Sequence, residues 1–185
     1  AMVATTNVCI IGGGAAGLTM ALELERHGID TIVLESGGYR PDPLTMDLYR
    51  GESVGIPYQF GDNYRSRFLG GCSNCWGGWC RPMDPEDFEK RDWVPGSGWP
   101  FGVEELNPFY ERAHEVLKLG PSNYDIDHWV RAIGSRDVRR MPLPSGELID
   151  SVSQFSWPVR FGRHYRRDLK SARHVRVFLH ANVVD

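Results

Sequence analysis

The stretch NVCIIGGGAAGLTMALELERHGIDTIVLE, residues 7–35, decides the fold. The short apolar run Val8–Ile11 ends at Gly12, a helical pattern continues to Gly28, and a second apolar run covers Thr31–Leu34. This order is typical of a strand, a tight turn, a helix and a second strand. The sequence therefore predicts a βαβ unit in an α/β fold.

Three glycines in this stretch have the G-x-G-x-x-G spacing of a dinucleotide-binding turn. Gly12 permits the sharp turn out of the strand, Gly14 lets a pyrophosphate approach the backbone, and Gly17 lets the helix pack close to the sheet. The free N–H groups of the first helical turn, which contains Ala15 and Ala16, would point at the phosphates.

Glu35 ends the second strand, where a carboxylate accepts hydrogen bonds from ribose hydroxyls. A carboxylate at this position also repels a 2′-phosphate, which disfavours NADP. The alternative is a glycine-rich loop in some other α/β protein. We favour a dinucleotide site because strand, helix, second strand and acidic residue occur in that order.

Composition excludes few classes of function. The chain has 185 residues, 41% hydrophobic residues and a net charge of −3. This balance gives no general reason to expect a nucleic-acid partner. The longest apolar run near the N-terminus is too short for a signal peptide or a membrane span. We therefore expect a cytoplasmic protein.

A second unusual stretch is FLGGCSNCWGGWCRP, residues 68–82, which follows a long region rich in turn formers. Paired glycines bring the backbone close to a flat or charged group, and tryptophans form pocket walls. Serine and asparagine supply hydrogen bonds. We interpret this stretch as a ligand-contact loop against a cofactor, and the alternative is a tight structural turn with aromatic packing.

These motifs, together with ESGG at 35–38 and PGSGWP at 95–100, resemble the glucose–methanol–choline (GMC) oxidoreductase family, closest to its pyranose-oxidase-like branch. The resemblance implies FAD and the oxidation of alcohols, often sugars, with hydride transfer from a substrate C–OH to the flavin. The loop at 70–78 would run along the FAD pyrophosphate toward the flavin ring, and the loop after a strand near 175 would contact the adenine.

The expected cofactor-binding residues lie in the glycine turn, at the end of the second strand, in the second glycine loop and near the end of the chain. They are Gly12, Gly14, Ala15, Ala16, Gly17, Glu35, Ser36, Arg67, Gly70, Gly71, Ser73, Asn74, Cys75, Trp76, Gly77 and Val183. Some family members carry a flavin-linked histidine directly before the tryptophan. This chain has Cys75 there, so a cysteinyl link and a noncovalent cofactor both remain open.

The rest of the chain indicates further helices and one strand. A helix over 108–118 is predicted, with Asn107 as its N-cap. Residues 127–133 and 161–173 also suggest helices. The alternation VRVFL at 175–179 predicts a strand that rejoins the first sheet.

We expect residues 1–36 and 174–185 to form the Rossmann-like part, 37–100 an FAD-contacting loop region, and 101–173 a mainly helical insertion that starts a second domain. A doubly wound sheet needs more strands. No catalytic residue is assigned, because nothing matches the family's C-terminal histidine motif. The fold is therefore expected to be incomplete without a partner, either the C-terminal remainder of the enzyme or a complementary chain.

The four cysteines leave alternatives open. Cys9 is expected to be a small core residue. Cys72, Cys75 and Cys80 lack a nearby fourth ligand for tetrahedral zinc, so no metal site is predicted. The pair Cys75 and Cys80 has the spacing found in flavin-dependent disulfide oxidoreductases. That class, and a noncatalytic nucleotide-binding subunit, are the alternatives to an alcohol or sugar oxidoreductase.

Overall fold

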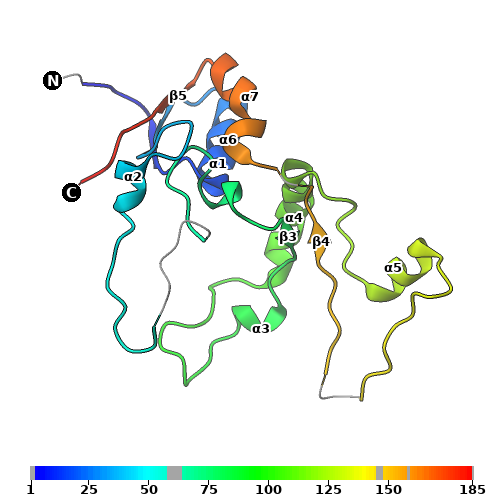
Figure 1. Cartoon of the computed structure of the whole chain (residues 1–185). Coiled ribbons are helices and arrows are strands. Elements are labelled where there is room, and N and C mark those ends of the chain that lie inside the picture. Colours follow the sequence, from blue (N-terminus) through cyan, green and yellow to red (C-terminus); the bar gives the residue numbers. More distant parts are fainter. Residues whose placement is uncertain (1–2, 58–63, 145–147, 158, 185) are drawn as a thin grey trace. The chain divides into compact units, whose positions relative to one another are not determined.

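The computed structural model describes residues 3–57, 64–144, 148–157 and 159–184 (Figure 1). The chain divides into two compact units, one formed by Ala1–Gly77 with Pro158–Asp185 and the other by Gly78–Trp157. Each unit is described by itself. The finer division into Rossmann part, loop region and helical insertion stays a prediction.

A three-stranded parallel sheet forms the centre of the first unit. Its strands are β1 (Val8–Ile11), β2 (Thr31–Leu34) and β5 (Val175–Phe178), in the order β1-β2-β5. Val8 pairs with Thr31, and Thr31 pairs with Val175. The predicted βαβ unit and the late return of the chain to the same sheet are both confirmed.

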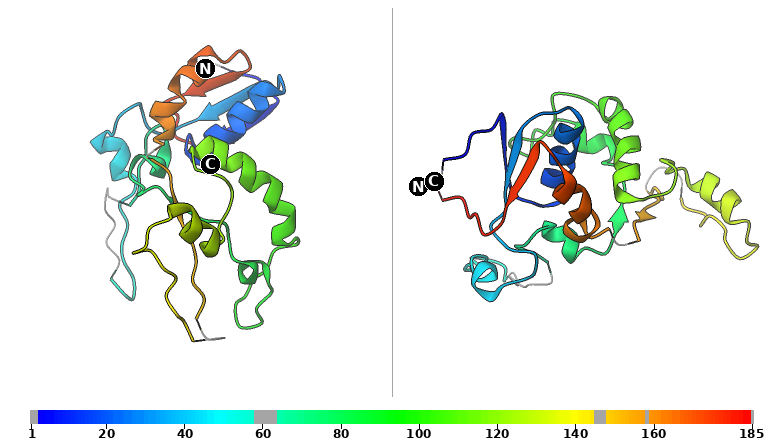
Figure 2. Two further views of the ribbon diagram at one scale, coloured as in Figure 1. Left: turned by 90° about the vertical axis from the view of Figure 1, so that its right-hand side faces the viewer. Right: turned by 90° about the horizontal axis from the view of Figure 1, so that it is seen from above.

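Helix α1 (Ala15–Arg26) connects β1 to β2 and packs on the sheet through the buried Leu18 and Ala21. Figure 2 shows α6 (Phe161–His164) and α7 (Arg166–Ser171) on the same face of the sheet as α1. The Glu25 carboxylate accepts backbone N–H bonds from three residues at the entry to β5, 2.8–3.0 Å long. This contact fixes the end of α1 against a strand about 150 residues later in the sequence.

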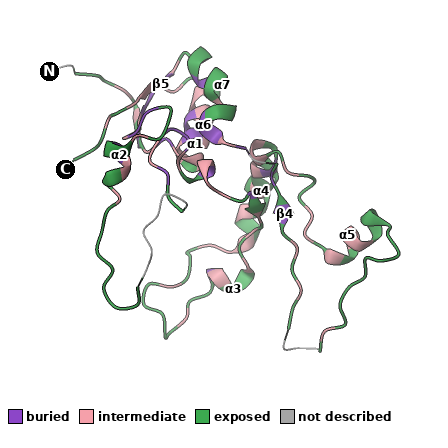
Figure 3. Ribbon diagram, viewed as in Figure 1, coloured by how far each residue is buried: buried purple, intermediate pink, exposed green. Residues whose placement is uncertain are grey.

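Buried residues gather around this sheet and its helices (Figure 3). Within β1, Ile10 is buried, whereas Cys9 and Ile11 are exposed. Successive side chains of a strand point to opposite faces, and α1 covers the face to which Ile10 points. The expectation that Cys9 is a core residue is therefore wrong.

Helix α2 covers Pro43–Asp47, and Asp42 caps it by accepting from Thr45 N (3.2 Å) and Oγ1 (2.7 Å). One helical prediction in this unit needs correction. The helix predicted over 161–173 is divided into α6 and α7 at Tyr165, whose φ of −91° and ψ of 7° leave helical geometry. The Tyr165 ring packs 5.3 Å from that of Phe161.

Within its described residues, the second unit contains short strands and three helices. Strands β3 (Trp79–Cys80) and β4 (Gln154–Phe155) pair antiparallel. The helices are α3 (Pro85–Phe88), α4 (Val103–Leu117) and α5 (Ile126–Ile133).

Helix α4 begins at Val103 after the extended Gly102, so the predicted N-cap at Asn107 is wrong. Pro108 lies inside the helix, where its ring nitrogen cannot donate to the Glu104 carbonyl. Glu104 and Pro108 are both exposed, so water can reach that carbonyl.

Candidate functional site

A cleft of about 420 Å³ lies at the carboxyl ends of β1 and β2, where open α/β sheets bind ligands. It is built from the first unit alone. Four parts of the chain meet there, namely the glycine turn with the end of β2, Tyr49, the segment 66–72, and the chain after β5. Of the predicted cofactor residues, those that line it are Gly12, Gly14, Glu35, Ser36, Arg67, Gly71 and Val183.

The N-terminus of α1 presents backbone N–H groups at this cleft. Gly14 is the N-cap, makes no side-chain capping bond, and is followed by a first turn without acidic residues. The first-turn N–H groups of Ala15, Ala16 and Gly17 lack helical acceptors, as at any helix start. A negative group at Gly14 would therefore meet uncompensated positive charge.

Gly14 and Gly17 face different surroundings. A Cβ on Gly14 would have Gly71 Cα, 3.9 Å away, as its nearest neighbour, so the backbone there is open to a ligand. A Cβ on Gly17 would lie 2.1 Å from the Gly12 carbonyl oxygen. Gly17 is therefore required for packing of α1 against the end of β1, as the fingerprint predicts.

Glu35 is buried and organises the loops at the cleft. Its Oε2 accepts from Gly13 N at 2.8 Å, and its Oε1 accepts from Gly37 N at 2.9 Å and from Ser36 Oγ at 3.4 Å. A carboxylate oxygen can accept two hydrogen bonds, so Oε2 can accept one more. The side chain can thus hold both backbone turns and still accept from a ribose hydroxyl.

Arg67 carries a positive charge into the same cleft. Its Nη1 donates to Ser36 Oγ (3.4 Å) and Asn182 Oδ1 (3.2 Å), and its guanidinium lies 4.5 Å from the centre of the Tyr49 ring. Its Nε is buried and has no hydrogen-bond partner. A buried N–H without an acceptor is costly, so this donor fits a ligand acceptor.

The loop over 70–77 is held by its own side chains. Ser73 Oγ donates to the Gly70 carbonyl (2.6 Å) and accepts from Phe161 N (3.0 Å). Asn74 Nδ2 donates to the Leu69 carbonyl (3.1 Å). Two predicted ligand contacts, Ser73 and Asn74, therefore position the loop with these atoms.

Arg160 fixes the same loop from a distant part of the chain. Its Nη1 donates to the carbonyls of Ser73 (2.8 Å) and Trp76 (2.9 Å). No motif in the sequence marks Arg160, since its role depends on the return of the chain to the first unit after residue 157. Sequence reasoning also missed Tyr49, Ser66 and Asn182, which line the cleft beside Arg67.

The remaining loop residues do not line the cleft in this structure. Gly70 adopts φ of 103°, and its N–H donates to the Gly13 carbonyl at 2.8 Å, which joins the two glycine turns. Cys75 is half-buried, Gly77 is exposed, and Trp76 Nε1 is buried without a partner. Burial, followed by the neighbouring Cys72, raises the pKa of the Cys75 thiol above its usual value.

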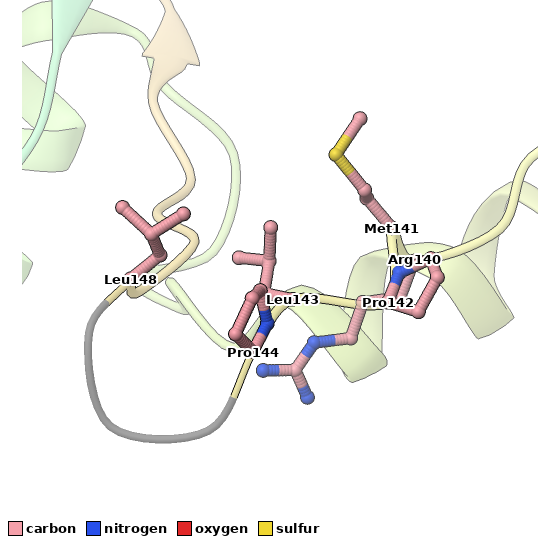
Figure 4. A pocket seen from close by; sticks show the side chains of 6 residues that line it. All are labelled: Arg140, Met141, Pro142, Leu143, Pro144 and Leu148. Atoms are coloured by element: carbon pink, nitrogen blue, oxygen red, sulfur yellow. The ribbon is translucent and has the colours of Figure 1, made fainter.

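A second hollow, of about 310 Å³, lies in the other unit (Figure 4). It is lined by Arg140, Met141, Pro142, Leu143, Pro144 and Leu148. Arg140 is already paired with Asp150 at 2.6 Å and with Asp127 at 3.4 Å. The hollow contains none of the predicted cofactor residues, so it is not a candidate cofactor site.

The chain is similar in sequence to known FAD-binding proteins and oxidases. Residues 5–40 match a family described as an FAD binding domain. The chain is 32% identical over 176 residues to paromamine 6′-oxidase of Streptomyces fradiae, a match that covers 85% of this chain and 31% of that protein. It is 30% identical over 164 residues to 6‴-hydroxyparomomycin C oxidase of Streptomyces lividus, covering 80% and 29%.

A solved structure shares the fold. Pyridoxine 4-oxidase from Mesorbium loti matches with a TM-score of 0.53 and 18% identity, over 95% of this chain and 42% of that one. The chain spans about a third of the length of the two curated oxidases that it matches. The predicted FAD-binding segment is confirmed by the family match.

None of the helices in the part of the chain that the structure describes has the length and apolar character of a membrane span. No group of three or more metal-ligating side chains occurs among the described residues either.

The geometry of the cleft, considered without the comparisons, fits FAD. The open space at Gly14, the uncompensated helix start and the unpartnered Arg67 Nε all suit a diphosphate. Glu35 suits a ribose diol.

Proposed function

We propose that this chain, which resembles the GMC-type FAD oxidoreductases, supplies the FAD site of an enzyme that oxidises a sugar-like alcohol. The observation that carries this proposal is the cleft, which combines an open glycine turn, a buried carboxylate and an arginine with a free donor. When bound, FAD accepts a hydride from the carbon that bears the hydroxyl.

The chain's own residues have distinct roles in this proposal. Gly14, Ala15, Ala16 and Gly17 receive the pyrophosphate at the start of α1, and Glu35 orients the ribose. Arg67 and Ser36 bind the same half of the cofactor, with Val183 near the adenine.

The 70–77 loop is proposed to lie along the pyrophosphate and the flavin edge. Its predicted contacts are Gly70, Gly71, Ser73, Asn74, Cys75, Trp76 and Gly77. Ser73 and Asn74 contribute mainly by fixing the loop, because their donors are engaged within it. A base from another part of the enzyme, the C-terminal remainder or a complementary chain, would remove the hydroxyl proton.

A protonated amino sugar is the substrate class we favour. Two relatives are named as oxidases of paromamine and hydroxyparomomycin. Acidic residues outnumber basic ones between residues 78 and 157, whereas basic residues outnumber acidic ones in the remainder. Such an acidic unit raises the local concentration of cationic substrates and repels anionic ones.

The four free cysteines support a reducing, cytoplasmic location.

The test is reduction of the bound cofactor by an alcohol. The FAD-loaded enzyme, in which this chain is present together with the part that supplies the base, is mixed without oxygen with paromamine, pyridoxine or glucose, and flavin absorbance is followed. We expect bleaching with an alcohol, fastest with paromamine, and formation of the matching carbonyl product. Bleaching by NADPH with thiol–disulfide turnover and none by any alcohol would instead support the disulfide oxidoreductase. FAD binding without any turnover would support a noncatalytic subunit.

A further inference from the structure

Two cysteines of the 70–77 loop stand on one side of a single turn. The segment η1 (Gly71–Asn74) is a 3₁₀ turn, in which side chains three residues apart eclipse one another. Cys72 lies within it and Cys75 is its C-cap, with Cys75 N donating to the Cys72 carbonyl at 3.1 Å. The Cys75 Sγ lies 3.4 Å from that same carbonyl oxygen. The Cys75 thiol is therefore folded back toward Cys72.

The backbone of this turn already suits a disulfide. One turn of a 3₁₀ helix rises about 6 Å. Disulfides join Cα atoms that are about 4.4–6.8 Å apart. Both thiols are free, so a bond between them requires rotation of the side chains with little backbone movement. Cys72-x-x-Cys75 is also the spacing found in thiol–disulfide exchange motifs.

The two thiols differ in environment. Cys72 is exposed and lines the cofactor cleft, whereas Cys75 is half-buried and does not line it. Burial and the nearby Cys72 raise the pKa of the Cys75 thiol above its ordinary value. An exposed thiol beside a more protected one is the arrangement of a first-oxidised cysteine and its resolving partner.

We propose that Cys72 and Cys75 form a reversible dithiol–disulfide couple at the cofactor cleft, with hydrogen peroxide as the oxidant. The Cys72 thiolate attacks one peroxide oxygen and the O–O bond breaks. Cys72 becomes a sulfenic acid, and the released hydroxide takes up the thiol proton to give water. The Cys75 sulfur then attacks the Cys72 sulfur, the S–O bond breaks, and a second water leaves with the Cys75 proton.

The couple goes beyond the proposed alcohol oxidation and does not need it. Two thiols lose two electrons and two protons, and one peroxide is reduced to two waters. Peroxide would arise beside the loop if oxygen reoxidises the flavin, but added peroxide serves equally. Failure of the couple and failure of the alcohol reaction are therefore measured separately.

The experiment is peptide mapping of the FAD-loaded protein after graded hydrogen peroxide and alkylation of the remaining thiols. We expect free thiols to fall from four to two, with a Cys72–Cys75 bond in the mapped peptide and full recovery with dithiothreitol. Cys72→Ser and Cys75→Ser should each abolish the bond. Cys75→Ser should also accumulate a sulfenic acid at Cys72, trapped by dimedone. Cys9→Ser, which alters an exposed thiol in β1, is the matched control and should leave the bond unchanged.

Occupancy of the cleft supplies a second readout. Because Cys72 lines the cleft, FAD should slow its oxidation severalfold relative to protein stripped of cofactor. Equal rates in the two forms would overturn the placement of Cys72 at the cofactor. A bond to Cys80 or Cys9, irreversible oxidation of Cys72 without a bond, or a flavin adduct on Cys75 would overturn the couple itself.

Discussion

Valine in place of Gly14 is expected to remove FAD binding while the protein still folds. Gly14 has φ of −80° and ψ of −173°, an extended conformation that any residue adopts. A Cβ there would meet nothing closer than Gly71 Cα at 3.9 Å. The added methyl groups would therefore project into the space proposed for the pyrophosphate, and little else is disturbed.

The expected loss is about 100-fold or more in FAD affinity, which corresponds to about 2.7 kcal/mol. Fluorescence titration of FAD measures it, and a thermal unfolding curve checks the fold. Gly14→Ala should give an intermediate loss, because alanine adds only one methyl group. Ala132→Val on the exposed side of α5 is the control for a helix residue that becomes β-branched. Wild-type affinity in Gly14→Val would mean that the pyrophosphate lies elsewhere.

Gly17→Ala is expected to lower the stability of the fold itself, whereas Gly14→Val lowers the affinity for FAD. The new Cβ would lie 2.1 Å from the Gly12 carbonyl oxygen and 3.2 Å from Ile10 Cγ2. Backbone atoms cannot rotate out of the way as a flexible side chain can. Helix α1 must therefore move away from β1, which separates Leu18 and Ala21 from the sheet they cover.

Overpacking of this kind costs about 1–3 kcal/mol and sometimes more, and a clash with backbone places Gly17→Ala at the upper end. Urea unfolding should show a lower midpoint and a reduced free energy of unfolding even when no FAD is present. Gly14→Ala, three residues earlier in the same motif, is the matched comparison and should unfold like the wild type. An unchanged free energy of unfolding in Gly17→Ala would contradict the close packing of α1 on β1.

The sheet and the first half of the cleft could be predicted because their signals are local. The runs Val8–Ile11 and Thr31–Leu34 carry apolar, β-branched residues of strand length, and the glycines between them have separate steric tasks. β5 was also predicted, since its alternation and β-branched residues suit a strand beside β2. These features depend on the chain immediately around them.

The errors arise where distant parts of the chain decide the outcome. The sequence predicts Cys9 as a core residue because Cys9 lies in an apolar strand. Helix α1 covers the face to which Ile10 points, and Cys9 points to the opposite, exposed face. The Ser73 hydroxyl and the Asn74 amide donate to the carbonyls of Gly70 and Leu69, which the sequence did not predict, and their role as ligand contacts stays a prediction. Arg160 donates to the carbonyls of Ser73 and Trp76, which lie 87 and 84 residues earlier in the sequence, and no local pattern predicts this contact.

The start of α4 shows a different limit. Asn107 followed by Pro108 is a good local helix start. In the structure the helix begins at Val103, so Pro108 lies inside it. Glu104 and Glu105 then lie in the first turn of the helix. Acidic residues there stabilise the helix N-terminus, so the earlier start offsets the missing proline N–H.

The most direct test of the cofactor assignment is a titration of the cofactor-free protein with FAD and, separately, with NAD. The cleft predicts saturable binding of one FAD per chain, with ADP as a competitor, because Gly14, Glu35 and Arg67 line the space that we propose for the half shared by FAD and ADP. It also predicts that FAD displaces any bound NAD. Saturable binding of NAD with no binding of FAD would contradict the account.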